Sequence, residues 1–66
     1  MTIILNGEPA PFEGSVADLV EQRFADRRLG GVAVAVNRGV VPRGSWESHR
    51  LVAGDRVEIV TAVQGG

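Results

Sequence analysis

The sequence predicts a single α+β domain in which a mixed sheet of four or five strands packs on one helix. Three observations support this fold class. The chain has 66 residues, a length that suits one domain only. One stretch has the apolar spacing of a helix, and the stretches on both sides of it have the patterns of strands. Short turn sequences separate these stretches, so we expect two hairpins flanking the helix.

The N-terminal stretch predicts a β-hairpin. Residues 2–5 (Thr-Ile-Ile-Leu) are rich in strand-forming side chains and are followed by Asn6-Gly7, the strongest short signal for a type I′ turn. The return strand, about residues 8–12, contains two prolines. Because proline cannot donate a hydrogen bond to a sheet ladder, we expect this strand to be short and to lie at an edge of the sheet.

One helix is predicted from Val16 to about Arg27. Ser15 is a typical N-cap residue, and the carboxylate of Asp18, three residues later, can complete a capping box. The next apolar residues have the i, i+3, i+4, i+8 spacing of one buried helix face: Val16, Leu19, Val20 and Phe24. Arginines at 27 and 28 suit the C-terminal end of the helix dipole, and the glycines at 30 and 31 provide a stop signal.

The stretch after the helix predicts a central strand. Residues 31–37 alternate, with valines on one face and alanines on the other, so we expect the valines to pack on the helix. The alanine face is small and apolar. It is either a thin solvated face or a surface that another protein could approach closely. A turn at residues 37–39 then leads to a short strand, Val40-Val41, which Pro42 ends.

The last third of the chain predicts one helical turn and one strand. Ser45 could cap the turn, and the ring of Trp46 is expected to close one end of the core, with its N–H bonded to a carbonyl or to water. In the strand at residues 56–60, Val57 and Ile59 should face inward. The first and last strands should pair in parallel at the centre, which gives the ubiquitin-like β-grasp arrangement.

Composition excludes several classes of function. The net charge is −1, and only three residues are aromatic, so there is no basic face with stacking platforms for nucleic acid. The longest apolar run, Val32–Val36, is far too short to span a membrane, and the N-terminus lacks a signal-peptide pattern. We therefore expect a soluble, cytoplasmic protein. The chain has no cysteine and one histidine, so neither a disulfide nor a metal site is expected.

No catalytic constellation is evident in the sequence. His49 directly follows Ser48, but neighbours in a helical turn do not face each other, so a nucleophile–base pair is not expected. We expect His49 to be a partly buried contact beside Trp46. The acidic residues occur singly, and the glycines lack the spacing of a phosphate-binding loop. The polypeptide is therefore expected to be a substrate of other enzymes, without a cofactor of its own.

The chain ends in Gly65-Gly66, and we expect residues 61–66 to form a flexible tail. Six extended residues reach at most ~20 Å, about the depth of an enzyme cleft. Glycines have no Cβ, so they can follow a narrow channel. The reactive group on offer is the carboxylate of Gly66, which ATP could activate as a mixed anhydride. The alternative is an ordinary frayed terminus.

Several of these residues together resemble the ThiS family, the sulfur carrier proteins of thiamine biosynthesis. The resemblance covers the whole chain and is strongest in three segments: Val41-Pro42-Arg43-x-x-Trp46-x-x-His49, Gly54-Asp55 and the terminal Gly65-Gly66. The first segment is fairly specific to the family. The other two occur more widely, for example in the small subunit of molybdopterin synthase.

The resemblance implies a mechanism and partners. A ThiF-like adenylyltransferase would use ATP-Mg to convert the Gly66 carboxylate to an acyl adenylate, and sulfur from a sulfur donor enzyme would displace AMP to leave a thiocarboxylate. A ThiG-like thiazole synthase would then use this sulfur for the thiazole moiety of thiamine. By position, Gly65 gives the tail access to these enzymes. The possible partner surface comprises Arg43, Trp46, His49, Val63 and Gln64.

Other functions fit the same residues. A carrier with identical chemistry could serve molybdopterin or another sulfur-containing metabolite. A ubiquitin-like protein modifier would be joined through Gly66 to a lysine of a target. A plain interaction module would leave the terminus idle.

Overall fold

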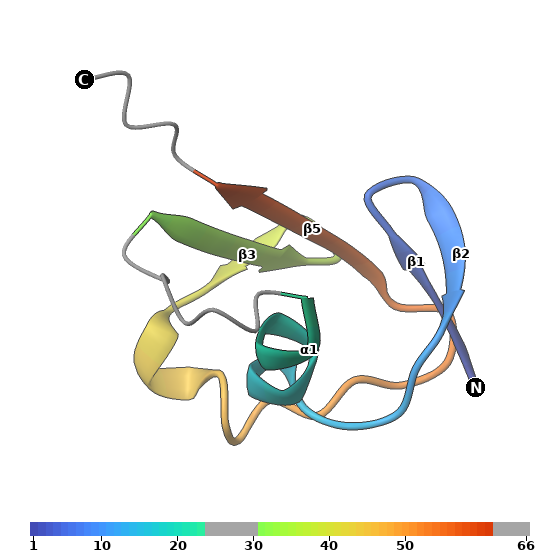
Figure 1. The fold of residues 1–66 in the computed structure, drawn as a ribbon, viewed down its shortest axis with the longest axis horizontal. Coiled ribbons are helices and arrows are strands. Elements are labelled where there is room, and N and C mark those ends of the chain that lie inside the picture. Colours follow the sequence, from blue (N-terminus) through green and yellow to red (C-terminus); the bar gives the residue numbers. More distant parts are fainter. Residues whose placement is uncertain (24–30, 62–66) are drawn as a thin grey trace.

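The computed structural model describes residues 1–23 and 31–61, which form five strands, one α-helix and one 3₁₀ helix. Along the chain these are β1 (Thr2–Leu5), β2 (Glu8–Pro11), α1 (Val16–Arg23), β3 (Val32–Val36), β4 (Gly39–Val41), the 3₁₀ helix Arg43–Ser45 and β5 (Arg56–Thr61). The strands form one sheet in the order β2-β1-β5-β3-β4, and α1 lies across one face of it (Figure 1). The predicted α+β architecture is confirmed.

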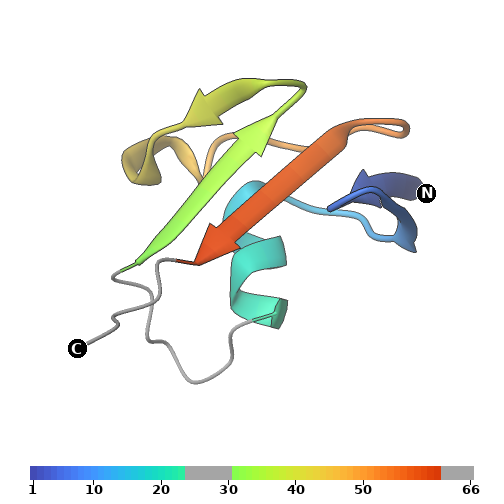
Figure 2. The same ribbon diagram turned by 90° about the horizontal axis from the view of Figure 1, so that it is seen from above.

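The centre of the sheet is the predicted parallel pair. β1 and β5 run in the same direction, with Ile4 opposite Arg56 and Leu5 opposite Val57. The remaining pairs are antiparallel, so the sheet is mixed. The proline-containing strand β2 lies at one edge, as expected. β5 runs beside β3 and pairs with all five residues of that strand (Figure 2). Because β5 also pairs with β1, this last strand joins the two hairpins to each other.

Both hairpins turn through residues with positive φ. Asn6 and Gly7 have φ values of 50° and 87°, which fit the predicted type I′ turn. The turn between β3 and β4 has φ values of 51° at Asn37 and 73° at Arg38. Arginine seldom adopts this conformation, so the closely paired antiparallel strands on either side hold it there.

The N-terminus of α1 is capped as the sequence predicts. The backbone N–H of Ser15 donates to the Asp18 carboxylate (3.0 Å), and the backbone N–H of Asp18 donates back to the Ser15 hydroxyl (3.2 Å). These two bonds form the predicted capping box. The bond from the Ser15 N–H is the main cause that holds the pKa of Asp18 below its ordinary value, and the Ser15 hydroxyl and the charge of Arg50 lower this pKa further. The predicted end of the helix falls on residues 24–30, outside the described residues.

The core fills the space between α1 and the sheet. The inward positions predicted for the helix, the central strand and the last strand are confirmed in the part of the chain that the structure describes, except that Val32 is only partly buried. The buried apolar side chains are Ile3, Leu5, Val16, Leu19, Val20, Val34, Val36, Val41, Trp46, Leu51, Val57 and Ile59.

The predicted cap at Ser45 is wrong. Ser45 is the last residue of the 3₁₀ helix, and the residue before that helix is Pro42, which has an extended ψ of 148° and makes no side-chain cap bond. The backbone N–H of Ser45 instead donates to the Pro42 carbonyl (2.8 Å). Pro42 begins the turn because its ring already fixes a suitable φ.

Candidate functional site

Strand β5 connects the domain to the C-terminal residues on which the predicted chemistry depends. Its side chains alternate, with Val57 and Ile59 buried and Arg56, Glu58 and Val60 exposed. Thr61, which the sequence assigned to the flexible tail, still pairs with Val32 of β3, so the strand continues one residue into that segment. The other predicted tail residues, including the site residues Val63, Gln64, Gly65 and Gly66, lie outside the described residues. Their roles stay predictions.

A mostly apolar surface that includes the carboxylate of Glu58 lies on the face of the sheet opposite α1. We call it the outer sheet face, and its residues are Ala33, Ala35, Val40, Glu58 and Val60. Val40 and Val60 are 78% and 62% exposed. The register places Ala33 opposite Val60, and Ala35 between Glu58 on β5 and Val40 on β4. The alanine face of the central strand is therefore widened by two exposed valines.

Trp46 belongs to the core, as expected. Its side chain is 5% exposed, and its indole N–H donates to the carbonyl of Val41 (2.9 Å). The guanidinium of Arg43 lies over the ring, 5.3 Å from its centroid, within the range of a cation–π interaction. Arg43 itself is exposed and His49 is partly buried. Of these three partner-surface candidates, Arg43 offers the most surface to another protein.

The same segment also holds the N-terminus of α1, which the sequence did not reveal. The carbonyl of His49 accepts from the N–H of Val16 (2.9 Å), and the carbonyl of Trp46 accepts from the N–H of Ala17 (3.0 Å). The Ser15 hydroxyl accepts from the next N–H, that of Asp18. The first three backbone N–H groups of the helix therefore all have hydrogen-bond partners. Since these two bonds use backbone carbonyls, no side-chain pattern could have predicted them.

The Gly54-Asp55 pair forms the entry to β5. Asp55 is 9% exposed, and its carboxylate accepts from the backbone N–H of Val52 (2.9 Å) and from the side-chain amide of Asn37 (3.0 Å). Gly54 has a φ of 87°, a conformation that favours glycine. This pair therefore fixes the loop before β5 and ties it to the β3–β4 turn.

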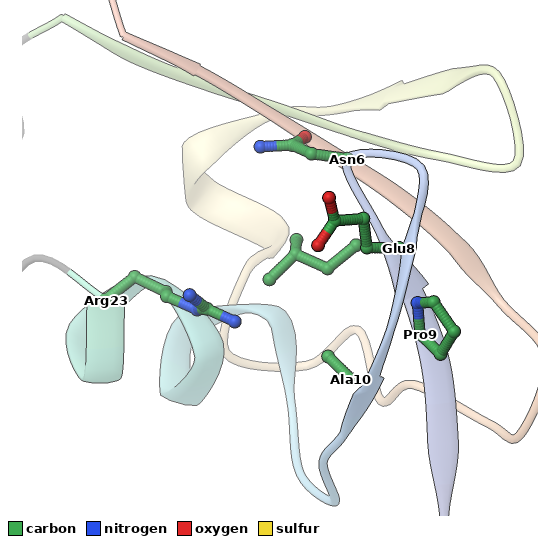
Figure 3. Close-up of a pocket in the computed structure, with 6 residues that line it drawn as sticks. Asn6, Glu8, Pro9, Ala10 and Arg23 are labelled. Carbon is green, nitrogen blue, oxygen red and sulfur yellow. The ribbon is translucent and has the colours of Figure 1, made fainter.

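A hollow of about 300 Å³ lies between the β1–β2 hairpin and the end of α1 (Figure 3). It is lined by Leu5, Asn6, Glu8, Pro9, Ala10 and Arg23. Its two charged side chains, Glu8 and Arg23, are of opposite sign and both are exposed. They offer neither the uniform charge nor the buried polar group that would orient a small ligand.

The described residues contain no reactive cluster. Within residues 1–23 and 31–61, no three His, Cys, Asp or Glu side chains are grouped as metal ligands. No buried side-chain polar atom in those same ranges lacks a hydrogen-bond partner. No helix in the described part of the chain is long and apolar enough to span a membrane. The one charged side chain buried in these ranges is Asp55, and its carboxylate is bonded to Val52 and Asn37.

Comparison with known proteins decides the family. The ThiS family model matches residues 3–66, nearly the whole chain. The chain belongs to the ThiS family. This match includes all three segments of the resemblance, from Val41-Pro42-Arg43 to the terminal Gly65-Gly66. As ThiS proteins are sulfur carriers, the expectation that this chain is a carrier and not an enzyme is confirmed.

Two individual proteins agree with this assignment. The chain is 36% identical over 52 residues to the sulfur carrier protein ThiS of Escherichia coli strain K12, and the alignment covers 79% of this chain and 76% of that protein. The crystal structure of the thiamine biosynthesis protein ThiS from Geobacter metallireducens superposes with a TM-score of 0.79 over the full length of both chains. At 24% identity, this second likeness supports the β-grasp fold alone.

Proposed function

We propose that this chain is a sulfur carrier of thiamine biosynthesis whose reactive group is the carboxylate of Gly66. The observation that carries the proposal is the family match through residue 66, since it includes the terminal diglycine. The name of the Escherichia coli relative, a sulfur carrier protein, supports the same assignment. The lack of a reactive cluster in the described residues agrees with a protein that other enzymes act on.

The proposed cycle has three steps. A ThiF-like adenylyltransferase transfers AMP from ATP-Mg to the Gly66 carboxylate and releases pyrophosphate. A sulfur nucleophile supplied by a donor enzyme attacks the acyl carbon, AMP leaves, and a thiocarboxylate remains. A ThiG-like thiazole synthase takes up this sulfur and returns the carrier as a carboxylate. The acyl adenylate is open to attack by water, so these steps belong inside enzyme clefts.

Residues 62–66, which we call the C-terminal arm, reach these clefts. Ala62, Val63 and Gln64 span the distance from the end of β5, and Gly65 leaves room for the chain at the narrowest point. The arm needs a docking surface that holds the domain in place while it is inserted. The outer sheet face is the best candidate, because Val60 belongs to the strand that leads into the arm and is 62% exposed.

Other residues complete the proposed contacts. Arg43 and His49 form a second, separate contact on the side of the sheet that carries α1, since the carbonyl of His49 is bonded to the start of that helix, and Trp46 supports Arg43 through the ring beneath its guanidinium. The chain itself binds no cofactor, and ATP-Mg belongs to the activating enzyme. Because the activation consumes ATP, we place the protein in the cytoplasm.

Release of pyrophosphate from ATP tests the first step. The purified chain, incubated with a ThiF-like adenylyltransferase and ATP-Mg, is expected to release pyrophosphate in proportion to the amount of chain. A chain without Gly66 serves as the control and should release none. Equal release from both would contradict the proposal.

Complementation separates thiamine synthesis from the other pathways. The gene should rescue a thiamine auxotroph that lacks its own sulfur carrier, and a form without Gly66 should not. Rescue of a molybdopterin-deficient strain alone would favour the other carrier function. Conjugates of high mass that survive reducing agent would instead favour a protein modifier.

A further inference from the structure

Asn6 makes two hydrogen bonds to a residue far away in the sequence. Its side-chain oxygen Oδ1 accepts from the backbone N–H of Ile59 (2.9 Å), and its Nδ2 donates to the backbone carbonyl of the same residue (3.4 Å). Ile59 is in β5, two residues before that strand ends at Thr61. The Asn6 side chain, drawn in Figure 3 between the hairpin turn and β5, therefore holds the end of the last strand.

These two bonds continue the sheet ladder after β1 has turned away. The backbone N–H groups of Ile4 and Asn6 donate to the carbonyls of Asp55 and Val57, both at 2.8 Å. In an evenly spaced parallel ladder the next partner on β5 is Ile59. The type I′ turn directs the backbone of β1 toward β2 at this point, so the side-chain amide of Asn6 takes the place of the missing backbone.

A second asparagine holds the other end of β5. The side-chain oxygen of Asn37 accepts from the backbone N–H of Arg56 (3.0 Å), the first residue of the strand. Asn37 and Asn6 have nearly equal φ values, 51° and 50°, and each begins a hairpin turn. Asn6 bonds both backbone groups of Ile59, whereas Asn37 bonds one backbone group of Arg56 and donates its amide to the Asp55 carboxylate. Of these two clamps, only that of Asn6 acts near the arm.

We infer that Asn6 is a positioning residue for the C-terminal arm. β3 pairs with Val60 and Thr61 on one side of β5. By holding both backbone groups of Ile59 on the other side, the Asn6 carboxamide completes the support of the strand end and so fixes the direction in which the chain enters the arm. This inference rests on the proposed function in one respect only, that the arm is the part delivered to an enzyme. The clamp itself is a property of the domain.

Glycine substitutions provide matched variants. Asn6→Gly and Asn37→Gly each remove one clamp and keep the backbone conformation, because glycine readily adopts a φ near 50°. In Asn6→Gly, hydrogen exchange of the Ile59 amide should become about fivefold to tenfold faster, as expected for the loss of one hydrogen bond. ¹⁵N relaxation should show a lower order parameter at Thr61. Asn37→Gly should accelerate exchange at Arg56 and leave Ile59 and Thr61 as in the wild type.

Kinetics of pyrophosphate release then tests the consequence for the arm. With a ThiF-like adenylyltransferase, well below the melting temperature of each variant, Asn6→Gly should lower kcat about fivefold to tenfold and leave KM within about twofold. The domain still docks through its unchanged outer sheet face, but fewer docked complexes have the arm inserted. Asn37→Gly should keep both constants within about twofold, even if it is the less stable variant.

The outcomes are separable. Unchanged Ile59 exchange in Asn6→Gly, or equal losses of kcat in the two variants, would overturn the inference. If the wild-type chain releases no pyrophosphate, the proposed function fails. The exchange and relaxation measurements on the free chain then still decide whether Asn6 holds the end of β5.

Discussion

The indole N–H of Trp46 donates a hydrogen bond of 2.9 Å to the backbone carbonyl of Val41. This bond joins the segment after the 3₁₀ helix to strand β4. The backbone carbonyl of Trp46 at the same time accepts from Ala17 at the start of α1. One residue thus links the helix to the far edge of the sheet, which explains why the segment from Arg43 to His49 matters for the fold.

Replacing Trp46 with phenylalanine tests this link. Trp46→Phe keeps an aromatic ring in the core but leaves the Val41 carbonyl without its partner, so we expect a loss of about 1–3 kcal/mol in the free energy of unfolding. Urea denaturation followed by circular dichroism measures it. Val52→Ala, at a valine that is 60% exposed, is the control and should change stability by less than about 0.5 kcal/mol. Equal stability of Trp46→Phe and the wild type would show that the bond from the Trp46 indole to the Val41 carbonyl does not stabilise the fold.

The capping box predicts a specific pH dependence. The pKa of Asp18 in the folded chain is below its ordinary value, which is about 3.9 in an unfolded chain. A carboxyl group whose pKa is lower in the folded chain than in the unfolded chain stabilises the fold. This stabilisation is fully present at pH values above the unfolded-state pKa, and it disappears as the pH falls through the folded-state pKa. Asp18→Asn should therefore destabilise the protein at neutral pH and have little effect near about pH 2.

Thermal unfolding of wild type and Asp18→Asn across this pH range provides the measurement. Glu47→Gln is a suitable control, because it removes one exposed carboxylate outside the helix cap. Its melting temperature should follow that of the wild type at every pH. A constant difference between Asp18→Asn and the wild type from neutral to acid pH would show that the charge of Asp18 has no part in the cap.

The outer sheet face can be tested with two similarly exposed valines. Val60 and Val52 are 62% and 60% exposed, but only Val60 lies on that face, while Val52 is in the loop before β5. Val60→Glu should raise KM for pyrophosphate release at least about tenfold, because it places a second carboxylate, besides that of Glu58, among the apolar side chains of the proposed interface. Val52→Glu makes the same change in net charge and should leave KM unchanged. Similar KM values for the two variants would argue against docking through the outer sheet face.

The narrow passage proposed for the arm predicts the effect of a larger side chain at Gly65. Gly65→Val should abolish adenylation and leave the melting temperature unchanged, since a branched side chain widens the arm and restricts φ. Thr61→Val serves as the control, because it keeps a β-branched side chain of similar size inside β5 and replaces only the hydroxyl by a methyl group, so it should support normal pyrophosphate release. Normal release by Gly65→Val would exclude a tight passage.

Much of the fold could be predicted because its signals are local. Asn6-Gly7 specifies a type I′ turn within two residues, and Ser15 and Asp18 specify the capping box within four. The predicted cap at Ser45 is wrong because the fixed φ of Pro42 starts the turn three residues earlier. Local patterns thus predicted the elements but not all of their boundaries, as the end of β5 at Thr61 also shows.

The contacts that hold β5 could not be predicted from the sequence. Asn6 bonds Ile59 across 53 residues, and Asn37 bonds Asp55 across 18. The tolerance of asparagine for positive φ already explains its presence in a turn. The sequence therefore gives no sign that these two side chains also form long-range hydrogen bonds to β5 and the loop before it. The outer sheet face was suggested by the alanines of β3, but Val40 and Val60 join it only through the strand register.

The central claim is that the terminal carboxylate of a small inert scaffold becomes the reactive group. Intact-mass measurement after incubation with ATP-Mg, a ThiF-like adenylyltransferase and a sulfur donor tests it most directly. The account predicts a gain equal to one sulfur atom replacing one oxygen, located on Gly66 and absent when that residue is deleted. An unchanged mass, or the same gain in the chain without Gly66, would contradict the account.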